Sequence, residues 1–197
     1  ISEIYSPPRI APHAEKAGFP PGWSLDLTVN DEHGQPWDFS QHECREKARQ
    51  LIRKSQPMLL VGSPMRTWFS VLQNLNKPRI DAADWKRGYD RAVEHIKFVF
   101  ELYVMQVRSG RYFLHEHPRL ATPWREPEIP NLLGQEKVDK INADQCQFGQ
   151  QTESEEPLKK PTGFMTNSDC IAERLAVRCE GGHRHIQLTG GRASAAQ

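Results

Sequence analysis

An apolar run from Met58 to Val61 ends abruptly in Gly62-Ser63-Pro64, and this stretch narrows the possible folds more than any other part of the sequence. A short apolar run bounded by turn residues predicts a buried β-strand. The Gly-Ser-Pro tripeptide predicts a loop directly after that strand. In open α/β sheets, ligands bind outside the carboxyl ends of the strands. The loop that begins at Gly62 is therefore a candidate functional site.

Apolar segments elsewhere alternate between strand-like and helix-like patterns. The clearest helix begins after Asp81 and carries an apolar stripe at helical spacing as far as Arg108. Such alternation is typical of an α/β domain with a mainly parallel open sheet flanked by helices. We expect strands at 2–5, 23–27, 57–61, 112–114, 143–148, 163–165 and 185–188, and helices at 10–18, 40–54, 82–108 and 168–178.

Composition excludes several classes of protein. The 197 residues suffice for one domain with a core. No apolar run approaches the roughly 18 residues of a transmembrane helix, so we expect no membrane association. The cysteines Cys44, Cys146, Cys170 and Cys179 lack tight disulfide spacing, which favours a reduced, intracellular context. The net charge of +1 gives no global electrostatic attraction to nucleic acid, but residues 159–192 are locally basic.

The loop after the apolar run resembles the catalytic loop of the DNA cytosine 5-methyltransferases, where a strand runs into Gly-Gly-Pro-Pro-Cys-Gln-Gly-Phe-Ser. Gly62, Pro64, Phe69 and Ser70 match that loop without a gap, and Arg66 stands at the position of the family's cysteine nucleophile. The sequence Lys159-Lys160-Pro161-Thr162-Gly163 is similar to divergent methylase-like segments of phage and retroelement polyproteins.

The resemblance implies a Rossmann-like methyltransferase fold over residues 1–167, followed by a C-terminal helix and a Cys/His-containing extension over 168–197. It implies S-adenosylmethionine as the cofactor and DNA as the partner. It also assigns roles to individual residues: Glu116 and Arg66 at the catalytic centre, Tyr5, Ser6, Asp26 and Pro64 at the cofactor, and Ser70, Lys159, Lys160 and Arg192 at the nucleic acid.

Two departures from the family pattern predict an impaired enzyme. An arginine guanidinium stays protonated and cannot act as a nucleophile, so Arg66 cannot replace the cysteine thiolate that attacks C6 of a flipped cytosine. The family's glycine-rich cofactor loop is here Tyr5-Ser6-Pro7-Pro8, in which the two prolines remove two backbone donors.

A thiol and two imidazoles lie within seven residues at Cys179, His183 and His185. Cys146 or Cys170 would complete a four-ligand set of the kind that zinc prefers. His183 and His185 would face the same side of a strand, which suits shared coordination. The alternative is a buried cysteine next to a surface histidine pair.

Three hypotheses for function follow from these patterns. The first is an impaired DNA cytosine methyltransferase-like domain. The second is a catalytically inactive nucleic-acid-binding module of a mobile element or phage polyprotein. The third is a zinc-stabilised interaction domain. For Glu116, the alternative to catalysis is a strand-end carboxylate paired with His115, His117 or an arginine. The oligomeric state stays open.

Overall fold

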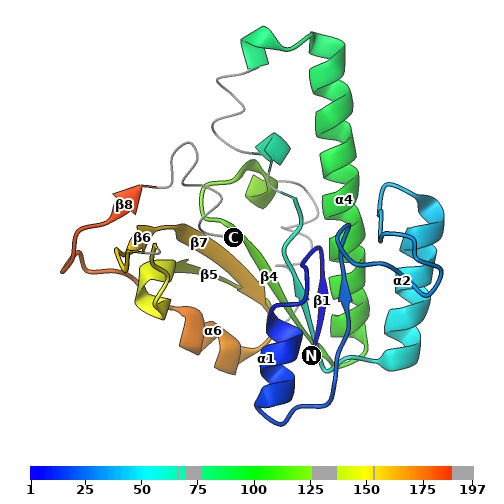
Figure 1. The fold of residues 1–197 in the computed structure, drawn as a ribbon, viewed down its shortest axis with the longest axis horizontal. Coiled ribbons are helices and arrows are strands. Elements are labelled where there is room, and N and C mark those ends of the chain that lie inside the picture. The colour runs from blue at the N-terminus through cyan, green and yellow to red at the C-terminus, as the bar shows by residue number, and fades with distance from the viewer. Residues whose placement is uncertain (66, 70–76, 126–136, 153, 188–197) are drawn as a thin grey trace.

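A computed structural model describes residues 1–65, 67–69, 77–125, 137–152 and 154–187 of the chain. Its centre is a six-stranded sheet with helices packed around it (Figure 1). The strand order is β2-β1-β3-β4-β7-β5. The strands span Ser24–Leu25 (β2), Ser2–Ile4 (β1), Leu59–Gly62 (β3), Tyr112–Pro118 (β4), Pro161–Thr166 (β7) and Asp139–Asp144 (β5).

The sheet is mixed. Strands β2, β1, β3 and β4 pair in parallel, whereas β7 runs antiparallel to both of its neighbours, β4 and β5. The α/β class is thus confirmed, and the sheet is mixed because one of its six strands, β7, runs opposite to the other five. A strand expected at 143–148 is wrong: β5 ends at Asp144, and Gln145–Phe148 forms a 3-10 turn. Ile141 and Ala143 are buried between exposed polar neighbours, so only two apolar residues signal this strand.

The described helices are α1 (Ile10–Lys16), α2 (His42–Ser55), α4 (Ala82–Arg108) and α6 (Asp169–Leu175). Helix α4 begins where expected, because the Asp81 carboxylate accepts hydrogen bonds from the backbone N–H groups of Ala83 and Asp84. Its buried stripe packs on β3 and β4, and Figure 1 shows its amino-terminal turns continuing beyond the edge of the sheet. None of the helices in the described residues is long and apolar enough to cross a lipid bilayer.

Helix α4 packs tightly against β3 at Gly62. A Cβ atom added to Gly62 would lie 2.0 Å from the Tyr103 hydroxyl oxygen. That hydroxyl lies 3.1 Å from Nδ1 of His115 on β4, and the Tyr103 ring stacks on Phe113. All three side chains are fully buried. Glycine at position 62 therefore lets one tyrosine join α4 to two adjacent strands.

The C-terminal part of the described chain is built differently from the sheet. Helix α6 packs on β5 and β7, and a separate two-stranded parallel pair joins β6 (Leu158–Lys159) to β8 (Ile186–Gln187). No residue from 176 to 186 is buried. A segment without buried apolar side chains gains little from the hydrophobic effect and needs other contacts to hold it.

The close approach at Gly62 generates a prediction for stability. Gly62→Ala should lower the free energy of unfolding by about 1–3 kcal/mol, because the new methyl group overpacks the core against Tyr103. In a Tyr103→Phe background the clashing oxygen is gone, so the same substitution should cost less. Urea unfolding of the double-mutant cycle measures this coupling. Equal costs in the two backgrounds would contradict the assigned contact, and Gly182→Ala, which meets open space, serves as the control.

Candidate functional sites

The carboxyl ends of β1, β2 and β3 surround a pocket of about 150 Å³. Tyr5 follows β1, Asp26 follows β2 and Ser63 follows β3, so three strand ends contribute to one site. A loop between β2 and α2 supplies a further wall. The lining residues are Tyr5, Asp26, Leu27, Trp37, Asp38, Phe39, Ser63, Met65 and His95.

Tyr5 is held in an unusual backbone conformation. Its φ angle of 56° lies in the left-handed region, which a bulky residue rarely adopts. Its hydroxyl lies 2.8 Å from Nδ1 of His95, and its ring packs 4.8 Å from that of Phe39. Burial lowers the pKa of His95, so its imidazole is neutral at pH 7. Strained backbone maintained by surrounding contacts concentrates at functional sites.

Two carboxylates border the pocket. Thr28 donates two hydrogen bonds to Oδ1 of Asp26, from its backbone N–H at 3.0 Å and its hydroxyl at 2.8 Å, which orients the carboxylate. Burial raises the pKa of Asp38, but hydrogen bonds from Ser40 and Gln41 outweigh it, and the net pKa is lowered. Asp38 is therefore ionised at pH 7. Carboxylates and aromatic rings around one pocket suit a ligand with hydroxyl or amino groups and a flat ring.

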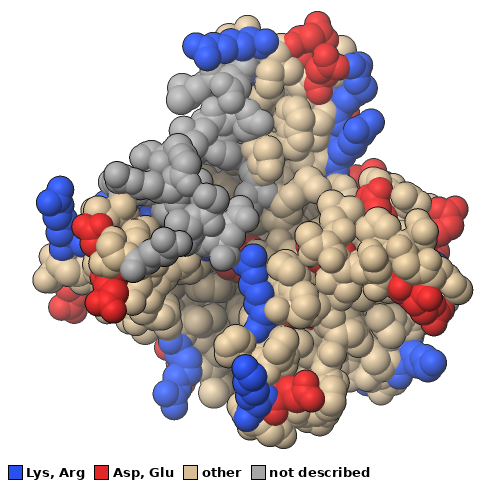
Figure 2. Space-filling view, viewed as in Figure 1, with Lys and Arg blue, Asp and Glu red and all other residues tan. Residues whose placement is uncertain are grey.

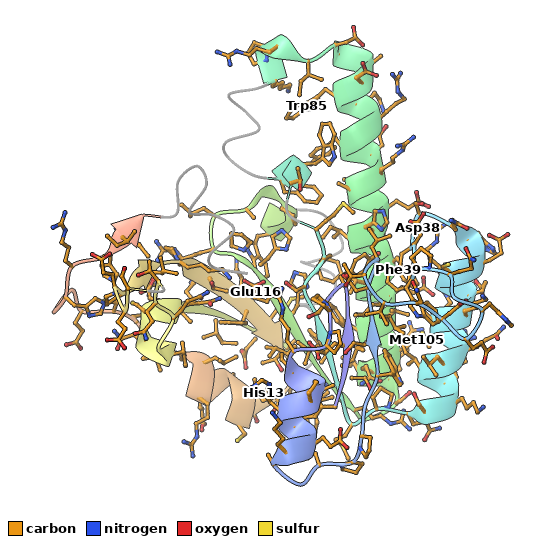
Figure 3. The ribbon with its side chains drawn as sticks, viewed as in Figure 1. His13, Asp38, Phe39, Trp85, Met105 and Glu116 are labelled. Atoms are coloured by element: carbon orange, nitrogen blue, oxygen red, sulfur yellow. The ribbon has the colours of Figure 1, made fainter. Side chains whose placement is uncertain are left out.

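Glu116 lies beside this pocket. Ser63, one of its lining residues, donates a 2.7 Å hydrogen bond to Oε2 of Glu116. Figure 3 shows Glu116 on β4, with Asp38 and Phe39 on the side toward α2. His115 and His117 alternate with Glu116 along the strand and are fully buried, with parallel rings 5.5 Å apart. The strand pleat thus turns the two imidazoles away from the Glu116 carboxylate.

Ser6 and Pro64, which the family resemblance assigns to a cofactor, lie elsewhere. The Ser6 hydroxyl lies 3.0 Å from the buried Glu3 carboxylate, which also accepts hydrogen bonds from the first amides of α1. Pro64 is buried between two residues that line the pocket. Neither Ser6 nor Pro64 lines the pocket itself. Arg66, Ser70 and Arg192 lie outside the described residues.

A second site lies at the far end of the sheet, where four half-buried side chains group together. The ligand atoms of Cys146, Cys179, His183 and His185 all lie within 4.8 Å of one another. Nε2 of His185 is 3.3 Å from the Cys146 sulfur and 3.4 Å from the Cys179 sulfur, and Nε2 of His183 is 3.8 Å from the latter. This Cys/His cluster has the donor atoms and the spacing to hold a metal ion.

Hydrogen bonds to the Asp144 carboxylate bring members of the Cys/His cluster together from distant parts of the chain. Asp144, at the end of β5, accepts hydrogen bonds from the Arg178 side chain at 2.7 Å and from the Cys179 N–H at 3.0 Å. Cys146 follows on the 3-10 turn. Of the two cysteines considered as the fourth ligand, Cys146 lies in the cluster, while Cys170 is exposed on α6.

Lys159 and Lys160 line a pocket of about 330 Å³ that borders the Cys/His cluster. Arg119 and Arg178 line the same pocket. The two lysines belong to the basic stretch that the sequence shows. Arg119 lies forty residues before Lys159 and belongs to no basic stretch. Only the fold places it there.

Sequence reasoning also missed Trp37, Asp38, Phe39 and His95. The first three lie between the expected strand at 23–27 and the expected helix at 40–54, and no spacing rule connects them to the end of β1. His95 stands within the apolar stripe of α4, where a histidine is usually a core residue. Its contact with Tyr5 depends on the packing of α4 against the sheet.

Comparisons with known proteins gave no relative. No protein-family model matches the chain, and neither a curated protein nor a solved structure matches it. The function must therefore be inferred from the two groups of side chains themselves.

Proposed function

We propose that this chain is a methyltransferase-like domain that binds the nucleoside part of S-adenosylmethionine in the pocket at the carboxyl ends of β1, β2 and β3. The observation that carries the proposal is the lining of that pocket. The Trp37 and Phe39 rings offer apolar faces to an adenine base, and the Asp26 and Asp38 carboxylates accept hydrogen bonds from hydroxyl and amino groups. A carboxylate after the second strand of such a sheet is the usual partner of a ribose hydroxyl.

The sheet topology supports the proposal. One antiparallel strand, β7, lies between β4 and β5, which run in the same direction as the other strands. Five of the six strands therefore share one direction, which is compatible with the mainly parallel sheet of a Rossmann-like fold. The Rossmann-like methyltransferase fold is thus part of the proposal.

The residues present suit the nucleoside half of S-adenosylmethionine better than its methionine half. A volume of about 150 Å³ suits a base and part of its sugar, and is small next to the roughly 300–1,000 Å³ of typical ligand sites. The methionine half would meet Tyr5-Ser6-Pro7-Pro8, where the prolines offer no N–H groups. Methyl transfer to cytosine in DNA would also need the nucleophile that Arg66 replaces. We therefore propose an impaired enzyme whose partner is DNA.

A second function is favoured by the Cys/His cluster, for which we propose structural Zn²⁺. With Zn–S bonds of about 2.3 Å and Zn–N bonds of about 2.0–2.1 Å, neighbouring ligands of a tetrahedral zinc lie roughly 3.3–3.8 Å apart. The three sulfur–nitrogen distances in the cluster fall within that range. A metal would also stabilise the segment from 176 to 186, which has no buried residue.

The cofactor proposal predicts binding by calorimetric titration. S-adenosylhomocysteine should bind the purified chain with a Kd on the order of micromolar, and adenosine should retain most of that affinity. Asp26→Asn and Asp38→Asn should each weaken binding about tenfold, because each removes a charge-assisted hydrogen bond. Asp139→Asn, which changes an exposed carboxylate on β5, should have no effect. If neither ligand binds the folded chain, the proposal is wrong.

The proposed impairment predicts a gain of chemistry in Arg66→Cys. With S-adenosylmethionine present, its thiolate should attack C6 of 5-fluorocytosine in a DNA duplex, and methyl transfer to C5 should leave a covalent adduct, because fluorine blocks the final elimination. Mass spectrometry detects the adduct. Arg66→Ser is the matched control, and adding Glu116→Gln should abolish the reaction. An Arg66→Cys protein that binds cofactor and DNA but forms no adduct would exclude the proposed catalytic geometry.

The zinc proposal predicts about one zinc per chain by elemental mass spectrometry. Cys146→Ser and Cys179→Ser should each reduce this to near zero, because each removes one of four ligands. Cys170→Ser should retain full occupancy, since Cys170 lies outside the cluster. Cobalt substitution should give the visible absorption of a tetrahedral thiolate site. Zinc that persists in both ligand variants would refute the site.

A further inference from the structure

We propose that the pocket lined by Arg119, Lys159, Lys160 and Arg178 binds backbone phosphates of a nucleic acid strand, and that the metal in the Cys/His cluster fixes one wall of it. The inference rests on the proposed zinc site and extends it from a structural role to a binding one. The pocket is called the phosphate pocket below.

The side chains that line the phosphate pocket are mainly positively charged. Four cationic side chains line it against one carboxylate, Asp144, which is paired with Arg178 at 2.7 Å. The Asp144 carboxylate accepts hydrogen bonds from the Arg178 side chain and from the Cys179 N–H, which orients that arginine. A Zn²⁺ held by two thiolates and two neutral imidazoles adds no net charge. The positive charge therefore comes from the side chains alone.

This charge is local. On the face that Figure 2 shows, basic and acidic side chains are interspersed over the described residues, in keeping with the net charge of +1. A net charge of +1 provides little diffuse attraction to polyanions, so binding would depend on contacts made within one pocket. Arginine and lysine N–H groups in such a pocket match phosphate oxygens, and the guanidinium can do so in a bidentate manner.

The walls of the phosphate pocket come from three separate segments. Arg119 follows β4, and its backbone N–H donates a hydrogen bond to the Pro161 carbonyl. Lys159 lies on β6, which pairs with β8 just after His185. Arg178 precedes the ligand Cys179 directly. Because the cluster joins the turn after β5 to the segment around β8, a metal there would fix the distance between these cations.

A nucleic acid strand is the occupant that these positions favour. Cations from three segments of the chain line one pocket, so more than one phosphate contact is available there, and contacts of this kind position a strand without reading its sequence. The pocket also lies beyond the end of β4, the strand that carries Glu116. A DNA strand held there would pass the edge of the sheet where the proposed cofactor pocket opens.

The test is fluorescence anisotropy with a short fluorescein-labelled DNA duplex and the zinc-loaded chain. Arg119→Gln combined with Lys159→Gln should weaken binding about tenfold or more and reduce the slope of log K against log salt by about 2. Lys16→Gln combined with Lys54→Gln, two exposed lysines on α1 and α2, is the matched control and should bind normally. Millimolar inorganic phosphate should compete poorly, because it occupies one contact at a time.

Zinc content measured on the same samples separates the two proposals. Chelation, or Cys179→Ser, should weaken DNA binding as much as the cation variant does, while the cation variant keeps its zinc. If the zinc-loaded Arg119→Gln, Lys159→Gln variant binds DNA normally, or if the wild type does not bind DNA, the proposed phosphate pocket is wrong. Neither result would contradict the zinc site. Unchanged DNA affinity after zinc removal would overturn the role of the metal. Full competition by inorganic phosphate would identify a free-phosphate site instead.

Discussion

The contact between Tyr103 and the backbone of Gly62 is the junction on which the rest of the molecule depends. It joins α4 to β3 at the last residue of that strand, and the Tyr103 hydroxyl meets His115 on the neighbouring strand β4. Ser63 follows Gly62 and Glu116 follows His115. The Ser63 hydroxyl donates a hydrogen bond to the Glu116 carboxylate. A buried aromatic contact therefore sets the spacing of the polar groups at the carboxyl edge of the sheet.

The two ends of the sheet are stabilised by different physical means. Around β1, β3 and β4, apolar side chains from α2 and α4 form a continuous core. Beyond β5 the chain folds back without burying a side chain between 176 and 186, and it is held by the Asp144 hydrogen bonds, the β6–β8 pair and the Cys/His cluster. Polar contacts of this kind contribute about 1 kcal/mol each, whereas a structural zinc contributes far more.

Much of the fold could be predicted from the sequence where local signals were strong. The Asp81 cap and the apolar stripe of α4 predicted that helix correctly, and Gly-Ser-Pro marked the end of β3. The strand β5 was misplaced because its exposed face is polar and only Ile141 and Ala143 point inward. The sequence suggested Cys179, His183 and His185 as ligands, with Cys146 or Cys170 as the fourth. Only the fold shows that Cys146, and not Cys170, lies in the cluster. The lining of the pocket at the carboxyl ends of β1, β2 and β3 by Asp38 and His95 depends on packing between distant segments, which no local pattern encodes.

Tyr5 illustrates how backbone strain and side-chain contacts can oppose each other at one residue. Glycine would adopt its φ of 56° without steric cost, so the backbone alone favours the smallest side chain. Glycine would also remove the aromatic wall of the pocket and the hydroxyl that meets His95. The contacts of the tyrosine side chain with Phe39 and His95 must therefore offset that steric cost, so the wall of the pocket and the backbone turn after β1 depend on the same side chain.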